Sequence, residues 1–100
     1  MNGWTALGDP TRHAIFKRLV EHPRAVGELA ATLPVSRPAV SQHLKVLKSA
    51  GLVADRRVGR QRVYRVEPEG LGQLRVEVDR FWNTTLAAYK TVVEQSAKEE

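Results

Sequence analysis

Residues 36–53 combine hydrogen-bonding side chains with the spacing of an amphipathic helix. At about 100° per residue, Val40, Leu44 and Leu47 fall on one side of that helix. The other side carries Arg, Ser, Gln and Lys, and no acidic residue occurs from position 37 to position 54. Arg and Lys donate to guanine O6 and N7, Gln forms paired bonds with adenine, and Ser bonds with several bases. The pattern indicates a helix that contacts base edges, and a structural helix with a basic surface is the alternative.

Side chains on this helix and in the segment after it form two sets of candidate contacts. Base contacts determine sequence preference, whereas phosphate contacts set affinity and its dependence on salt. The expected base contacts are Arg37, Ser41, Gln42 and Lys45. The expected contacts with phosphates, or from the segment after the helix, are Ser36, His43, Lys48, Arg56, Arg57, Arg60 and Arg62.

The charge of the chain is unevenly distributed. The whole sequence carries a formal +5, from 16 Lys and Arg against 11 Asp and Glu. Between positions 37 and 65, eight basic residues stand against one acid, Asp55, so this segment alone carries +7. A basic block between near-neutral ends is typical of a protein that binds a polyanion, and a solvated basic surface is the alternative.

The elements around the helix predict a helix-turn-helix over about residues 26–50. Ser36 is placed to cap the second helix, Pro38 suits its first turn, and Gly51 suits a left-handed end. A shorter amphipathic helix precedes it, and Pro34 lies in the break between the two. In such a motif the second helix enters the major groove of DNA.

A β-hairpin is predicted next, over about residues 52–66. Two segments rich in Val and Arg are joined at Gly59-Arg60-Gln61, which suits a turn. A hairpin in this position makes the motif a winged helix-turn-helix, with the hairpin as its wing. We expect Arg60 at the tip to lie nearest an adjacent minor groove, and Arg56 and Arg62 to contact the DNA backbone.

The whole chain is predicted to form a single domain, residues 1–100, that is mainly α with a β-hairpin wing. Asp9-Pro10 predicts the start of a helix that ends near residue 22, after a short helical piece. Glu67–Gly70 predicts an interruption before the longest helix, over about residues 71–96.

The last helix predicts self-association. Its apolar residues alternate at spacings of three and four, and aromatic residues widen the stripe. Such a surface on so small a chain is expected to form the seam of a homodimer. The alternatives are a purely monomeric core and a ligand pocket lined by aromatic residues. The expected dimer interface is Trp4, Leu74, Val78, Phe81, Trp82, Leu86, Tyr89 and Val93.

Several classes of protein are disfavoured by what the sequence lacks. There is no cysteine, which excludes disulfides and thiolate metal sites within this chain. No apolar run is long enough to span a membrane, and the first residues lack the layout of a secretory signal, so a cytoplasmic protein is expected. No nucleophile–base pair, glycine-rich phosphate loop or carboxylate pair emerges, so we expect neither an enzyme nor a cofactor.

Metal binding by histidine is not expected either. His22 lies near the predicted end of a helix, where a protonated ring is favourable without any ligand. His43 is expected at the edge of the core or at a phosphate. A site that joins His13 or His22 to a carboxylate across a dimer is the alternative.

Three stretches together resemble the ArsR-type winged-helix repressors of bacteria. The resemblance covers residues 7–66, and it implies a helical core with a β-wing, a homodimer, and repression by occupying an operator. The final helix, with RFWNTTLAAYK, resembles the branch of the family that has no evident metal site. The stretches that carry the resemblance are ALGDPTRHAIFKRLVEHP, VGELAATLPVSRPAVSQHLKVLKSAGLV and RRVGRQRVYRV.

The chain departs from the family's two common metal patterns. Where the family places a Cys-x-Cys pair, this sequence reads Val26-Gly27-Glu28-Leu29. Where a second type places Asp and His pairs on the last helix, this one offers Glu77, Asp79 and Glu94 without histidine. Neither metal pattern carries over.

The sequence thus predicts a sequence-specific DNA-binding transcriptional regulator. A homodimeric repressor would present two recognition helices about 34 Å apart to an inverted repeat in double-stranded DNA. It would work in the cytoplasm on the bacterial nucleoid, with an effector that is an organic molecule, a partner protein or none. The alternative is a winged-helix protein-interaction module without sequence-specific DNA binding.

Overall fold

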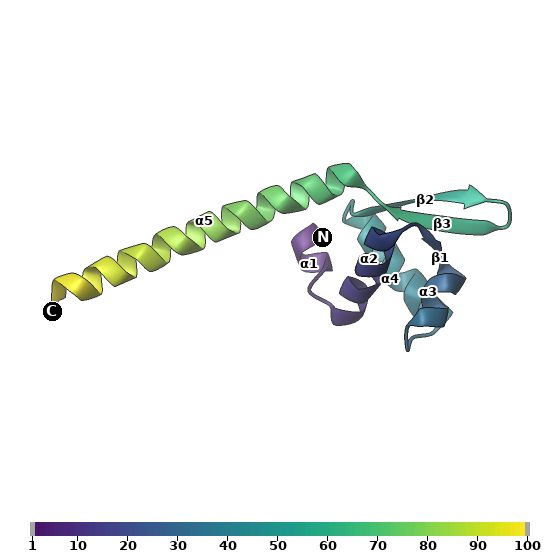
Figure 1. The fold of residues 1–100 in the computed structure, drawn as a ribbon, viewed down its shortest axis with the longest axis horizontal. Coiled ribbons are helices and arrows are strands. Elements are labelled where there is room, and N and C mark those ends of the chain that lie inside the picture. The colour runs from purple at the N-terminus through teal and green to yellow at the C-terminus, as the bar shows by residue number, and fades with distance from the viewer. Residues whose placement is uncertain (1, 100) are drawn as a thin grey trace.

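The computed structural model describes residues 2–99 as a helical body with a β-wing and one long helix (Figure 1). This confirms the predicted fold class, mainly α with a hairpin wing. The helices are α1 (Gly3–Ala6), α2 (Pro10–Glu21), α3 (Val26–Thr32), α4 (Arg37–Ser49) and α5 (Pro68–Glu99). The strands are β1 (Arg24–Ala25), β2 (Val53–Val58) and β3 (Gln61–Val66).

The hydrophobic core lies where α2, α3 and α4 pack together and against the base of the wing. Each of these helices contributes side chains that are fully removed from solvent. Burying one such aliphatic side chain stabilises a fold by about 1.5–3 kcal/mol. The largest fully buried side chains are Ile15, Leu29, Val40, Leu44, Leu47 and Leu52.

The wing belongs to a three-stranded antiparallel sheet with the order β1-β3-β2. In the hairpin, Val53 pairs with Val66 and Val58 pairs with Gln61, which leaves a two-residue turn. The third strand, β1, was not predicted, because a strand of two residues is too short to show alternation. It extends the sheet through the pair Ala25 and Val63.

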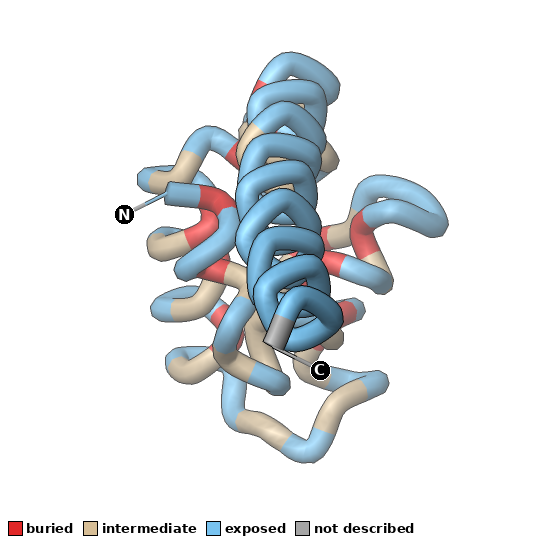
Figure 2. The backbone as a smooth tube through the Cα atoms, turned by 90° about the vertical axis from the view of Figure 1, so that its left-hand side faces the viewer, coloured by how far each residue is buried: buried red, intermediate tan, exposed pale blue. Residues whose placement is uncertain are grey.

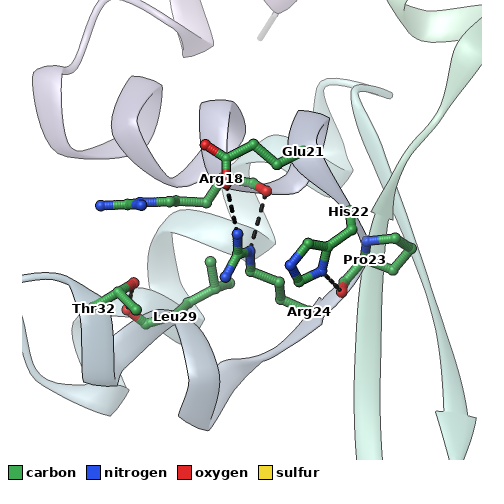
Figure 3. A network of polar contacts seen from close by, with 7 residues as sticks. All are labelled: Arg18, Glu21, His22, Pro23, Arg24, Leu29 and Thr32. Carbon is green, nitrogen blue, oxygen red and sulfur yellow. Dashed lines mark hydrogen bonds and ion pairs between the residues drawn. The ribbon is translucent and has the colours of Figure 1, made fainter.

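β1 is anchored to the end of α2 by one basic side chain (Figure 3). Arg24 Nη2 donates to Glu21 Oε2 at 2.7 Å, and Arg24 Nε donates to the Arg18 carbonyl at 3.2 Å. The Pro23 carbonyl accepts a hydrogen bond from His22 Nδ1 at 2.8 Å. Arg24 therefore has a structural role, although its charge contributes to the basic total.

Three predicted local features are confirmed: the cap of α4, the end of α4 and the turn of the wing. Ser36 Oγ accepts a hydrogen bond from Ala39 N at 3.3 Å, so it caps α4. Gly51 follows α4 with a φ of +78°, the left-handed conformation that glycine adopts without strain. Gly59 opens the wing turn with a φ of +62°, while Arg60 keeps a negative φ, as in a type II′ turn.

The start of α5 differs from the prediction. Glu67–Gly70 was expected to interrupt the chain, but α5 begins at Pro68, because proline fits the first turn of a helix and lacks only an amide that would be unpaired there. Leu71 N donates to the Glu67 carbonyl at 3.0 Å. Gly70 is required because a Cβ at this position would overlap the Gly51 carbonyl. The long helix is thus seated directly on the end of α4.

Beyond its first turns, α5 leaves the rest of the molecule (Figure 1). It makes the structure elongated, with principal extents of 67 × 27 × 22 Å. The part of α5 from residue 79 to residue 98 is exposed throughout, as the pale-blue tube in Figure 2 shows. Within residues 2–99, no helix combines the length and the apolar character that crossing a membrane requires.

Candidate nucleic-acid interface

The predicted division of α4 into two faces is confirmed. Val40, Leu44 and Leu47 have no exposed surface and fix the helix to the core. All four expected base-contacting residues lie on the exposed side, and His43 is half-buried on the shoulder. A rigid helix thus presents a polar face without a covering element. The exposed residues are Arg37, Ser41, Gln42 and Lys45.

α3 lies across the start of α4 and completes the helix-turn-helix. Leu29 is fully buried between them. Arg37 lies directly over α3, because a Cβ at Gly27 would stand only 2.9 Å from Arg37 Nη2. This role of Gly27 was not predicted, because its only signal in the sequence is a small residue in the first turn of α3.

A shallow hollow connects the start of α4 with the wing. It has a volume of about 150 Å³ and lies between the beginning of α3, Arg37 and the first residues of β3. Three arginines from separate parts of the chain therefore line one concave surface. The lining residues are Ala25, Val26, Gly27, Arg37, Arg60, Gln61 and Arg62.

The wing carries its basic residues in exposed positions. Arg56, Arg57, Arg60 and Arg62 are all exposed on the hairpin. Arg57 is partly fixed, because its Nε donates to the Gly59 carbonyl at 3.2 Å. Arg60 occupies the turn itself, as expected from the sequence.

Asp55 binds two of the side chains that were expected to contact phosphates. Its Oδ1 lies 2.8 Å from Lys48 Nζ, and its Oδ2 lies 2.9 Å from Arg62 Nη1. The Lys48 ammonium, followed by the Arg62 guanidinium, holds the pKa of Asp55 below its ordinary value. Charge counting had treated Asp55 only as one acid within the basic block. No local pattern of residues predicts this contact, because it depends on where the wing returns relative to α4.

Comparison with known proteins agrees with this arrangement. A family described as a helix-turn-helix domain matches residues 7–56. The chain is 58% identical over 91 residues to the HTH-type transcriptional regulator Rv2034 of Mycobacterium tuberculosis, which covers 91% of this chain and 85% of that protein. It is 46% identical over 69 residues to the HTH-type transcriptional repressor SmtB of the same species, covering 69% of this chain and 51% of the repressor.

Solved structures extend the likeness to the fold. A crystal structure of a possible transcriptional regulator for arsenical resistance superposes with a TM-score of 0.78 at 45% identity, covering 82% of this chain and 85% of that one. The homodimeric winged helix-turn-helix DNA-binding domain of a possible ArsR-family regulator from Mycobacterium bovis gives a TM-score of 0.66 at 31% identity, covering 83% and 77%.

The chain belongs to the ArsR/SmtB family of winged helix-turn-helix transcriptional regulators. The predicted resemblance is therefore confirmed. The family consists of transcriptional regulators and not of enzymes.

Asp9 lies at the start of α2 in this ArsR/SmtB regulator. Its Oδ1 accepts a hydrogen bond from Arg12 N at 2.9 Å, which caps α2 and holds the pKa of Asp9 below its ordinary value. The charge of His43 acts in the same direction. His43 therefore lies near the start of α2, at the edge of the core.

The expected dimer residues divide into two groups. Leu74 and Val78 are half-buried, and Leu74 packs against the core of its own chain. The other six are exposed, and the rings of Trp4 and Phe81 are tilted against each other with their centroids 5.7 Å apart. Leu74 and Val78 also line two adjoining apolar hollows of about 370 and 550 Å³ beside α5. The exposed group is Trp4, Phe81, Trp82, Leu86, Tyr89 and Val93.

The described part of this ArsR/SmtB chain brings no metal-binding set together. No group of three or more His, Cys, Asp or Glu side chains within it is arranged to hold a metal ion. The three histidines lie on α2, at its end and on α4.

Proposed function

We propose that this protein is a sequence-specific DNA-binding repressor that acts as a homodimer on an inverted-repeat operator. The observation that carries the proposal is the construction of α4. Three fully buried side chains hold it, and its opposite face offers donors and acceptors suited to base edges. A helix that only faced water would carry acids and bases in mixed order.

Base and phosphate contacts divide between the helix and the wing. Arg37, Ser41, Gln42 and Lys45 select the sequence from the major groove. Arg60 reaches toward the minor groove from the wing tip, where a narrow A·T tract attracts arginine. Affinity and salt dependence come from the other basic and polar residues around the helix and on the hairpin. These are Ser36, His43, Lys48, Arg56, Arg57 and Arg62.

The homodimer forms through α5 and α1. Nine large apolar side chains are exposed on these elements, six of them in the expected interface, which is too many for a small chain to leave in water. The Mycobacterium bovis domain is described as homodimeric, and its fold matches this one. A two-fold axis would place the two copies of α4 about 34 Å apart, one turn of DNA.

The proposal also covers repression and the kind of signal that would control it. SmtB, a relative, is named a repressor. Because this chain contains no cysteine, a thiolate metal sensor is not part of the mechanism that we propose. The regulator would act in the cytoplasm, where the bacterial nucleoid lies.

Fluorescence anisotropy tests the proposal. The purified protein is titrated onto the duplex upstream of its own gene and onto a scrambled duplex of equal composition, across a series of salt concentrations. We expect a preference of about a hundredfold or more for the upstream DNA, with one dimer bound per site. Equal, salt-sensitive binding to both duplexes would contradict sequence-specific recognition there. Absence of binding to either at low salt would favour the protein-interaction module.

A further inference from the structure

We propose that Asp55 is a specificity-determining positioning residue. It competes with DNA phosphates for two of the cations that are proposed to contact them, Lys48 and Arg62, and it fixes the wing to the recognition helix. The inference rests on the proposed function, because it concerns how strongly the protein distinguishes its operator from other DNA.

The first observation is the geometry of the contact. Each carboxylate oxygen of Asp55 binds a different cation, Lys48 at 2.8 Å and Arg62 at 2.9 Å. The side chain of Asp55 is only 5% exposed, whereas those of Lys48 and Arg62 are 56% and 57% exposed. The carboxylate is thus covered by its two partners, and both cations are oriented by it.

The second observation is the placement of the three residues. Lys48 lies in the last turn of α4, Asp55 on β2 and Arg62 on β3. Asp55 pairs in register with Tyr64, so Arg62 is its diagonal neighbour on the same face of the sheet. One carboxylate therefore links the end of the recognition helix to both strands of the wing.

The third observation is the charge of the surroundings. Asp55 is the single acid among eight basic residues between positions 37 and 65. Each additional phosphate contact steepens the dependence of log K on log salt by about 0.9. Two cations released from Asp55 would add phosphate contacts on any duplex, but on the preferred duplex this gain would be offset, because the wing would lose its fixed position beside α4. Specificity is a ratio of affinities, so a residue that weakens binding to random DNA raises it.

Asp55→Asn tests the inference, with Asp79→Asn as the matched control. Both changes remove one negative charge, but Asp79 lies exposed on α5, away from the wing. Binding is measured on the preferred duplex and on random duplex across a salt series, after circular dichroism has verified folding. For Asp55→Asn we expect the random-duplex slope to steepen by about 1–2. The ratio of preferred to random affinity should fall about fivefold or more, while Asp79→Asn keeps the wild-type values.

A double variant identifies the cation responsible. Adding Lys48→Gln to Asp55→Asn should reduce the steepened slope by about 0.9, because the freed ammonium is then absent. If Asn at position 55 prevents folding, Asp55→Thr replaces it, since threonine suits a strand. Amide hydrogen exchange in the wing, measured against pH, gives a further readout. In the wild type, protonation of Asp55 in acid should loosen the wing. Asp55→Asn should remove that part of the pH dependence.

The outcomes separate the two proposals. If wild-type protein does not distinguish the preferred duplex from random DNA, the proposed function fails. If wild-type protein does distinguish them and Asp55→Asn matches Asp79→Asn in slope and ratio, the role of Asp55 is overturned.

Discussion

Helices α4 and α5 both carry an apolar stripe, but only α4 has its stripe covered by its own chain. Leu44 on α4 has no exposed surface, whereas Leu86 and Trp82 on α5 are 46% and 59% exposed. In sequence the two stripes look alike, with apolar residues at spacings of three and four. They differ in what lies opposite them.

The α4 stripe therefore contributes to folding of the monomer, whereas the α5 stripe is available for assembly. The α4 stripe meets α2 and α3 within the first half of the chain, so it contributes to the stability of the monomer. Beyond Phe81, which contacts Trp4 of α1, the α5 stripe continues past the body of the molecule, and its residues are exposed (Figure 1). In the homodimer that we propose, a second copy buries this stripe, so its contribution to stability should depend on protein concentration.

The largest effect is expected from Leu44→Ala compared with Leu86→Ala. Leu44→Ala should lower the free energy of unfolding by about 2–5 kcal/mol, because it leaves a cavity in a closed core. Leu86→Ala should cost less, and its cost should shrink as the protein is diluted. Urea unfolding at two protein concentrations measures both. A large, concentration-independent cost for Leu86→Ala would show that α5 packs on its own domain.

Trp82→Glu should disrupt assembly without disrupting the fold. Removing a central aromatic residue from an interface typically costs at least about 2 kcal/mol, which corresponds to a rise in the dimer Kd of about thirtyfold. Sedimentation velocity measures the shift toward monomer. Ala87→Glu introduces the same charge on the side of α5 that faces away from the stripe, and it should leave the dimer intact. Equal effects of the two variants would place the seam elsewhere.

Gln42→Ala tests the exposed face of α4, because it should change DNA binding and leave the buried face of the helix unchanged. We expect a loss of about 1–3 kcal/mol in binding to the preferred duplex and little change on random DNA, because a base contact disappears. Arg56→Gln, on the wing, should weaken binding to both duplexes alike. Anisotropy titrations at one salt concentration distinguish them. Unchanged sequence preference in Gln42→Ala would mean that α4 lies in the groove in another orientation.

The smallest effect is expected from Asp9→Asn, at the start of α2 and near His43. The lowered pKa of Asp9 in the folded state stabilises the protein above the ordinary carboxyl pKa of 3.8, and this is lost as the pH falls through the folded pKa. Asparagine caps a helix equally well but does not titrate in this range. Stability at neutral pH should therefore change little, and the loss of stability in acid should be less steep. Urea midpoints measured from neutral pH down to about pH 3 check both expectations. An acid loss as steep as that of the wild type would assign the pH dependence to Asp55.

Local patterns were sufficient for most of the elements. The Asp9-Pro10 and Ser36 starts, the left-handed Gly51 and the Gly59 turn depend only on neighbouring backbone and were correctly predicted. Two elements were not. β1 is too short to have a period, and the start of α5 looked like a break because proline and glycine occur in both loops and first helical turns.

The sequence by itself determined which face of α4 is apolar, that the middle of the chain is basic, and most of the points where the chain turns. These properties depend on the order of residues and on helical or strand periodicity. Only the tertiary structure decided that Asp55 meets Lys48 and Arg62, that Arg37 lies over Gly27, and that the α5 stripe stays uncovered. Such contacts depend on how separate elements pack in space, which no local period records.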